Sequence, residues 1–243
     1  MTLINVGNKY DNTGVNQQPV YARKLIEKSP SVIGLKNSKA AVMLVLKPIE
    51  SKLNILEKDN RILKISENRY LATTGLESDI QFIYRLLKDK AIEYKKTYGE
   101  EVSTECLKST LEYYLHVFSS AISTRVIGAD FMIMSRENDE FSIHCTTPDL
   151  IALKFRGCVI GSMHRKARTE IEKYDLESLD VNGLIDCGVK SFYKSFDPIV
   201  DKEFKLEIGV ISDETNGKFK RLSEDEVMSY VELYKDLTVE DVE

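Results

Sequence analysis

Short apolar runs separated by polar turns follow residue 30, and they predict two β-hairpins. Residues 31–36 (SVIGLK) and 40–46 (AAVMLVL) flank the polar triplet NSK. Residues 61–65 (RILKI) and 69–75 (RYLATTG) flank SEN in the same way. Apolar runs of this length, bounded by turn-forming residues, are typical of paired antiparallel strands.

A helical pattern replaces the strands between the second hairpin and residue 122. Apolar side chains recur every three or four positions, first behind the cap candidates Ser78 and Asp79 and again after the break GEEVS. The apolar positions are Ile80, Ile83, Tyr84, Leu87, Ala91, Tyr94 and Tyr98, then Leu107, Leu111, Tyr114, Phe118 and Ile122. We therefore expect two consecutive amphipathic helices.

Strands and helices come again in sets in the second half of the chain. The predicted elements are strands at 129–135, 141–146 and 151–156, helices at 162–174 and 181–196, a late strand at 204–212, and a last helix opened by the capping box SEDE at 223–226. Paired helices between sets of hairpin strands favour two helical layers over stacked antiparallel sheets. The pattern predicts one α+β domain, a four-layer α/β/β/α sandwich.

Composition agrees with a globular chain and narrows its partners. The 243 residues are 42% hydrophobic and 30% charged, and no Pro/Gly/Ser-rich linker divides them. The chain has no apolar run of about 20 residues and no signal-peptide pattern at its start, so we expect a soluble, intracellular protein without membrane contact. The net charge of −5 argues against nucleic acid as the main partner.

Residues with metal-binding or nucleophilic chemistry are scattered. The candidates are Cys106, Cys145, Cys158 and Cys187, with no C-x-x-C pair, and His116, His144 and His164, which never fall at ligand spacing. We expect buried free thiols and neither a metal site nor a cofactor. In HCTTPD (144–149) the adjacent His and Cys of one strand point to opposite faces, which favours a core cysteine beside a surface histidine over a nucleophile–base pair.

The glycine-containing segment RGCVIGSMHRKAR (156–168) leads into a basic helix and hints at phosphate binding. Its glycine spacing matches neither the dinucleotide nor the P-loop fingerprint, so a structural turn is favoured. From these residues alone, the chain offers no convincing active site.

Four stretches, in order and at matching separations, carry a family resemblance. They are Tyr10–Asp11 with VYARKLIEKSPSVIGLK (20–36), SKL (51–53) with TGLESD (74–79), GCVIGSMHRKARTEIEK (157–173), and KEFKLEIGVISDETNGKF (202–219). Together they resemble the alpha subunits of the proteasome core particle, and the last stretch is most similar to the type-3 group, the seventh alpha in yeast order. The resemblance spans residues 7 to 235.

This resemblance implies a sandwich of the N-terminal-nucleophile hydrolase type and a non-catalytic role. Such subunits form the outer heptameric ring of the 20S particle, gate substrate access, and dock activators or the regulatory particle for ubiquitin-dependent protein degradation. The implied partners are neighbouring alpha subunits, beta-ring subunits and activators, in cytoplasm and nucleus. The implied domains are a gate tail at 1–18, the alpha-subunit domain at 19–237 and a short acidic tail at 238–243.

The nucleophile of active beta subunits has no counterpart in this sequence. These subunits are cut between Gly and Thr, and an Asp and a Lys assist the new N-terminal Thr. The family pattern places Ser29 at the Gly, Pro30 at the Thr, Leu46 at the Asp and Arg61 at the Lys. Within the chain, the nitrogen of Pro30 is a tertiary amide and neither base nor nucleophile. Ser31 would become a nucleophile only after a cut following proline.

The resemblance implies two other sites. Tyr10 and Asp11 match a Tyr-Asp pair that stabilises the gate tails; the alternative is a disordered terminus. Ser29, Arg61 and Gly75 match an activator pocket, in which Arg61 pairs with the C-terminal carboxylate of an activator. The alternative is a structural surface arginine.

The sequence departs from the family pattern at three places, and the first departure bears on the length and order of the gate. The segment after Tyr10–Asp11 is several residues shorter than usual, the usual R-P-F-G is RVIG at 125–128, and the long acidic tail is reduced to TVEDVE. Two alternative functions stay open. One is a peptidase with an N-terminal nucleophile, including a beta-type subunit, and the other is an unrelated intracellular binding protein.

Overall fold

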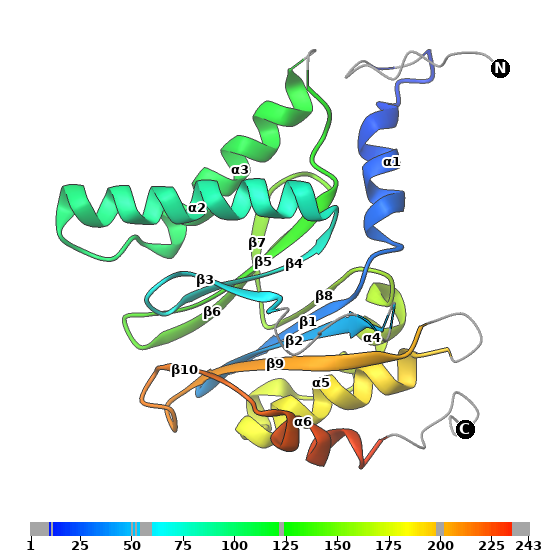
Figure 1. Ribbon diagram of the computed structural model, residues 1–243, viewed down its shortest axis with the longest axis vertical. Coiled ribbons are helices and arrows are strands. Elements are labelled where there is room, and N and C mark those ends of the chain that lie inside the picture. The colour runs from blue at the N-terminus through cyan, green and yellow to red at the C-terminus, as the bar shows by residue number, and fades with distance from the viewer. Residues whose placement is uncertain are drawn as a thin grey trace.

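Two five-stranded antiparallel sheets lie face to face between two layers of helices (Figure 1). This is the architecture of the computed structural model, and it confirms the predicted four-layer sandwich. The structure describes residues 10, 12–49, 51, 53, 60–121, 124–197 and 202–234.

The first sheet has the strand order β10-β9-β2-β1-β8. Its strands are β1 (Val32–Lys36), β2 (Ala40–Pro48), β8 (Gly157–Ile160), β9 (Phe204–Ser212) and β10 (Phe219–Arg221). The hairpin predicted around NSK is β1–β2. The sequence reading missed β8 and β10 because they are only four and three residues long and gain their order from β1 and β9.

The second sheet has the order β3-β4-β5-β6-β7. Its strands are β3 (Ile62–Ser66), β4 (Arg69–Gly75), β5 (Ala129–Glu137), β6 (Glu140–Thr146) and β7 (Ala152–Phe155). Each strand pairs with its neighbour in the sheet, which confirms the predicted second hairpin and the predicted strands after residue 128.

The helices form two layers, with one helix set apart. The described helices are α1 (Gln17–Ile26), α2 (Glu77–Tyr98), α3 (Thr104–Ser120), α4 (His164–Ile171), η2 (Leu176–Ser178, one 3₁₀ turn), α5 (Val181–Ser195) and α6 (Glu224–Val231). Figure 1 shows α2 and α3 over the second sheet, α4, α5 and α6 over the first, and α1 standing beside the sandwich.

The two predicted helix starts have different outcomes. At α6, Ser223 and Glu226 form the predicted capping box. At α2, the prediction that Ser78 and Asp79 cap the helix is wrong, because the N-cap is Leu76 and Asp79 lies inside the first turn. The carboxylate of Asp79 has tertiary partners, described below.

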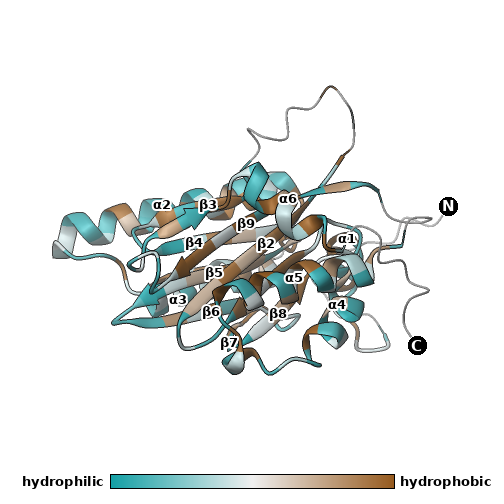
Figure 2. Ribbon diagram, turned by 90° about the horizontal axis from the view of Figure 1, so that it is seen from below, coloured by the Kyte–Doolittle hydropathy of each residue, from teal (hydrophilic) through white to brown (hydrophobic). Residues whose placement is uncertain are grey.

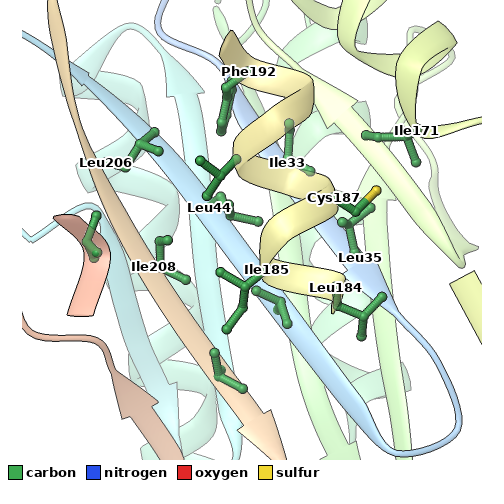
Figure 3. Close-up of a cluster of buried hydrophobic side chains, with 14 of the residues drawn as sticks. Ile33, Leu35, Leu44, Ile171, Leu184, Ile185, Cys187, Phe192, Leu206 and Ile208 are labelled. Atoms are coloured by element: carbon green, nitrogen blue, oxygen red, sulfur yellow. The ribbon is translucent and has the colours of Figure 1, made fainter. Parts of the chain in front are cut away.

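Three apolar clusters fill the spaces between the layers. One lies between the sheets, one under α2 and α3, and one under α4, α5 and α6. In Figure 2 the sheets carry mostly hydrophobic colours, and the outer sides of the helices are largely hydrophilic. Figure 3 shows the third cluster, where Phe192 and Ile185 of α5 lie over Leu44 of β2.

The ends of the chain lie largely outside the described residues. These include residues 1–9 and Asp11 of the predicted gate tail and all of the predicted 238–243 tail. Ile122, predicted to end the face of α3, is outside them as well. Helix α1 begins at Gln17, so the predicted division after residue 18 falls within its first turn.

Candidate functional site

Pro30 leads directly into β1, and its backbone is held from two sides. The carbonyl oxygen of Pro30 accepts a hydrogen bond from the hydroxyl of Thr74 in β4, at 2.5 Å. One residue earlier, the carbonyl oxygen of Ser29 accepts from the N–H of Ser162, at 3.0 Å. The junction between α1 and β1 is therefore fixed to both sheets.

Two glycines, one at this junction and one at the end of β4, are required because another part of the backbone comes too close for a side chain. At Gly161 φ is +96°, and a Cβ would lie 2.4 Å from the oxygen of Pro30. At Gly75 φ is +124°, and a Cβ would lie 2.3 Å from the oxygen of Gly128. Both conformations favour glycine. Gly161, the one of these two glycines that lies in the segment 156–168, therefore forms part of a structural turn.

The hydroxyl of Ser31 is fully buried and already engaged. It accepts a hydrogen bond from the N–H of Met163, at 2.8 Å, and lies 3.2 Å from the hydroxyl of Ser162. Met163 is the N-cap of α4 and has no capping side chain of its own. Ser31 thus satisfies a donor at the start of α4, which gives this buried serine a structural partner.

The other two residues at the degenerate nucleophile site point into different layers. Leu46 is buried in the cluster beneath α4, α5 and α6. Arg61 precedes β3, and its guanidinium pairs with Glu77 of α2 at 2.9 Å. The side chain of Arg61 is 39% exposed. Leu46 and Arg61 therefore lie in two different environments.

Glu207 of β9 is a buried carboxylate that the sequence reading did not single out, although it lies in the motif KEFKLEIGV. It pairs with Arg221 at 2.9 Å and with Lys47 at 3.3 Å. It also accepts hydrogen bonds from the N–H groups of Arg61 and Ile62. Because β9 and β3 belong to different sheets, this one carboxylate ties the sheets together beside Arg61.

Tyr10 is the described member of the predicted gate pair; Asp11 lies outside the described residues. Tyr10 forms an isolated antiparallel bridge with Asn16, and its side chain is highly exposed. Asn16 in turn caps α1, since its side-chain oxygen accepts from the N–H of Gln18 at 3.1 Å. The segment leading to α1 is thus joined to the helix start.

The segment RVIG at residues 125–128, which differs from the usual R-P-F-G of the family, contacts two helices. Asp79 accepts two hydrogen bonds from Arg125, at 2.5 and 2.6 Å, and one from the N–H of Gly128, at 2.8 Å. Val126 donates its N–H, which a proline lacks, to the side chain of Gln18 in α1 at 3.0 Å. Burial opposes ionisation of Asp79, but the donors from Arg125 and Gly128 outweigh it and hold its pKa below the usual range.

A second ion pair fastens α1 to β5. Arg23 donates to the carboxylate of Asp130 at 2.6 Å, and only 7% of the Asp130 side chain is exposed. Burial raises the pKa of Asp130, although Arg23 and the hydroxyl of Thr146 favour its charged form. Apolar and charged side chains of α1 and the start of β5 line a cavity of about 390 Å³ around this pair.

The strand pair His144 and Cys145 points to opposite faces, as predicted. Cys145 lies in the cluster between the sheets. His144 is half-buried rather than on the surface, because its face of β6 is turned towards α3, and burial together with Lys154 and Lys108 lowers its pKa. All four cysteines are free; Cys106 is half-buried and the other three are buried.

The described part of the chain contains neither a candidate metal site nor a candidate membrane-spanning helix. There, no three His, Cys, Asp or Glu side chains gather where they could hold a metal ion. Among the helices described, none is long and apolar enough to cross a membrane.

Comparison with known proteins assigns the fold to a family. Residues 26–211 match the family model described as proteasome subunit. A probable proteasome subunit alpha type-7 of Encephalitozoon cuniculi is 33% identical over 232 residues, covering 96% of each chain. A proteasome subunit alpha type-3 of Oryza sativa is 29% identical and covers 86% of this chain and 84% of its own. A proteasome subunit alpha of Methanoculleus marisnigri is 25% identical and covers 90% of each chain.

The chain therefore belongs to the proteasome subunit family, and its sandwich is that of the N-terminal-nucleophile hydrolases. Within this family it is an alpha-type subunit, which confirms the family predicted from the four sequence stretches.

Proposed function

We propose that this chain is a non-catalytic structural subunit of the outer alpha ring of the 20S proteasome core. Membership of the family implies assembly with other proteasome subunits. In this proposal its neighbours are alpha subunits within the ring and beta subunits of the adjoining ring. Its role in protein degradation is to control access to proteases on other chains.

The observation that carries the non-catalytic role is the state of Pro30 and Ser31. Pro30 stands where active relatives of the family place the threonine nucleophile. Its nitrogen is a tertiary amide without a proton, and its carbonyl oxygen accepts a hydrogen bond from Thr74. The hydroxyl of Ser31 is buried and bonded to the start of α4. An N-terminal nucleophile needs a free amine beside an accessible hydroxyl. Neither residue meets both needs.

Incubation of the purified subunit with fluorogenic peptides and a covalent threonine-directed inhibitor tests this proposal. We expect no turnover above buffer and no mass shift on the chain. An adduct on Ser31, or a chain that begins at Ser31, would support the peptidase alternative instead.

The gate proposal concerns Tyr10 and Asp11. The bridge between Tyr10 and Asn16 links Tyr10 to the cap of α1, which supports a role of this residue in the position of the tail. In core particles, Tyr10→Ala should change the basal hydrolysis of a fluorogenic peptide at least about twofold if the tail helps to close the pore. Val15→Ala, an exposed apolar change nearby, serves as the control. Equal basal rates in all three particles would contradict the gate role.

The activator proposal concerns Ser29, Arg61 and Gly75. The half-exposed guanidinium of Arg61 is held by Glu77, and the C-terminal carboxylate of an activator would offer the same chemistry. Arg61→Ala should weaken binding of activator tails about tenfold, the effect of one lost charged hydrogen bond. Lys64→Ala, which breaks another exposed ion pair in β3, is the matched control. Equal affinity of both variants would reject the pocket.

We also propose residence in both cytoplasm and nucleus, and action in ubiquitin-dependent degradation through a regulatory particle. A fluorescently tagged chain should appear in both compartments. Depletion of the chain should slow the loss of a ubiquitin-fused reporter. Restriction to one compartment, or unchanged reporter decay, would contradict the respective proposal.

A further inference from the structure

Burying the carboxylate of Asp79 costs free energy, and its position between two segments gives this residue a role beyond stability. Its side chain is 8% exposed and accepts hydrogen bonds from Arg125 and from the N–H of Gly128. A buried carboxylate of this kind is weak evidence for stability alone, because apolar packing can replace it without loss. The carboxylate instead links two particular segments, because it joins the first turn of α2 to residues 125–128.

On one side of residues 125–128 lies α1. Val126 donates its N–H to Gln18, and two positions beyond the segment Asp130 pairs with Arg23. A Cβ placed on Gly128 would lie 3.0 Å from a methyl group of Leu25, so α1 also packs closely on this segment. Hydrogen bond, ion pair and apolar contact thus attach α1 to residues 125–130.

On the other side lie the residues of the proposed activator pocket. The N–H of Leu76 donates to the oxygen of Gly128 at 2.8 Å, and Gly75 makes its close approach to the same oxygen. Arg61 pairs with Glu77, two residues before Asp79 in the same helical turn. The segment is therefore in contact with the pocket on one side and with α1 on the other.

We propose that Asp79 is a positioning residue that couples the pocket at Arg61 to α1 and the segment beginning at Tyr10; this rests on the proposed activator docking. When a carboxylate pairs with Arg61, Glu77 loses its ion-pair partner and keeps only the hydrogen bond from Gln81 of the same helix, so the first turn of α2 can shift. Asp79 makes residues 125–128 follow that shift. The contacts of Val126 with Gln18 and of Asp130 with Arg23 then transmit it to α1. Hydrogen-bond networks between rigid elements are known carriers of such coupling.

Asp79→Asn in an assembled core particle tests the coupling. Asparagine can still accept from the N–H of Gly128, but it cannot form the charged two-point contact with Arg125. The probe is a short synthetic peptide that ends in the free carboxylate of an activator tail, and its amidated form is the blank. Two quantities are measured: the Arg61-dependent binding of the labelled peptide, and the peptide-induced change in amide exchange of residues 17–26 of this chain.

We expect binding to stay within about twofold of the unmodified particle. The exchange response of α1 should fall at least about fivefold, the lower end of typical couplings between sites. A residue with a merely structural role would change the basal exchange of α1 without separating binding from response. Glu101→Gln is the matched control, because it removes an ion pair with Lys95 at the far end of the same helix.

Each other outcome overturns a defined claim. Normal binding with an unchanged exchange response in Asp79→Asn rejects the coupling and leaves the docking proposal intact. Absence of Arg61-dependent binding in the unmodified particle rejects docking and the coupling with it. If Asp79→Asn fails to assemble, Arg125→Gln replaces it, because that side chain is 55% exposed. A full exchange response in Arg125→Gln rejects the coupling.

Discussion

Glu207 holds the two sheets together at one end of the sandwich, because one buried carboxylate receives donors from both. Lys47 and Arg221 of the first sheet neutralise it, and the N–H groups beside β3 satisfy its remaining acceptor sites. Removing one partner from a buried ion pair leaves an uncompensated charge.

Glu207→Gln should therefore lower the free energy of unfolding by about 3–5 kcal/mol. The measurement is equilibrium unfolding of the isolated subunit in urea. Glu224→Gln, which breaks an exposed pair with Lys205, should cost at most about 1 kcal/mol. Similar losses in both variants would show that Glu207 is not a tie between the sheets.

The pKa of Asp79 gives a prediction about pH. Because the folded state holds this pKa below its usual range, the ionised carboxylate stabilises the fold above the ordinary pKa of about 3.9. That contribution is lost as the pH falls through the lower pKa of the folded state. Asp79→Asn should thus be less stable than the unmodified subunit at neutral pH, and the gap should narrow from about pH 5 downwards. Thermal unfolding at several pH values measures it, and a constant gap would contradict the role of the charge.

At the scale of single residues, the sequence indicated which residues occupy key positions, but not which partners they contact. Pro30, Leu46 and Arg61 could be assigned through the family resemblance, because the missing hydroxyl and the missing carboxylate are properties of residue type. The partners of Asp79 could not, since Arg125 and Gly128 are distant in sequence, and a carboxylate near a helix start reads equally well as a cap. Glu207 was hidden inside an otherwise ordinary strand motif.

The helix α5 lies close on β2 because Gly188 faces Leu44. A Cβ on Gly188 would lie 2.6 Å from a methyl group of Leu44, and both residues are buried. Figure 3 shows Leu44 directly beneath this helix. The close approach depends on a residue without a side chain.

Gly188→Ala should destabilise the subunit by about 1–3 kcal/mol through overpacking, despite the better helix propensity of alanine. A double-mutant cycle with Leu44→Val tests the cause. The two changes together should cost less than the sum of the single losses, because the smaller side chain makes room for the new methyl group. Strictly additive losses would place the strain elsewhere.

Among the elements, those with an apolar pattern or a capping motif of their own were predictable, and those that depend on a neighbour were not. α2, α3 and α5 carry an apolar face over several turns, and β1, β2, β4 and β5 are apolar runs next to turns. β8 and β10 have no such pattern of their own, since their order comes from pairing with β1 and β9. The start of α1 at Gln17 likewise depends on a cap from Asn16.

At the scale of the whole molecule, the chain has the sandwich of the N-terminal-nucleophile hydrolases, and in our proposal the nucleophile position is occupied by Pro30. The segment before β1, which an active relative would lose, is here the helix α1, fastened to β5 by Arg23 and Asp130. A cut after Pro30 would discard that helix. The fold therefore favours a subunit that is retained whole and acts by assembly.

Purification of the assembled complex through a tag on this chain, followed by native and denaturing mass spectrometry, tests the central claim most directly. We predict that the chain is recovered in a particle with other alpha and beta subunits and that it still contains the residues before Pro30. Inhibitor adducts should be found on beta subunits only. A chain recovered as a small free species, or one that begins at Ser31 and carries the inhibitor, would contradict the claim.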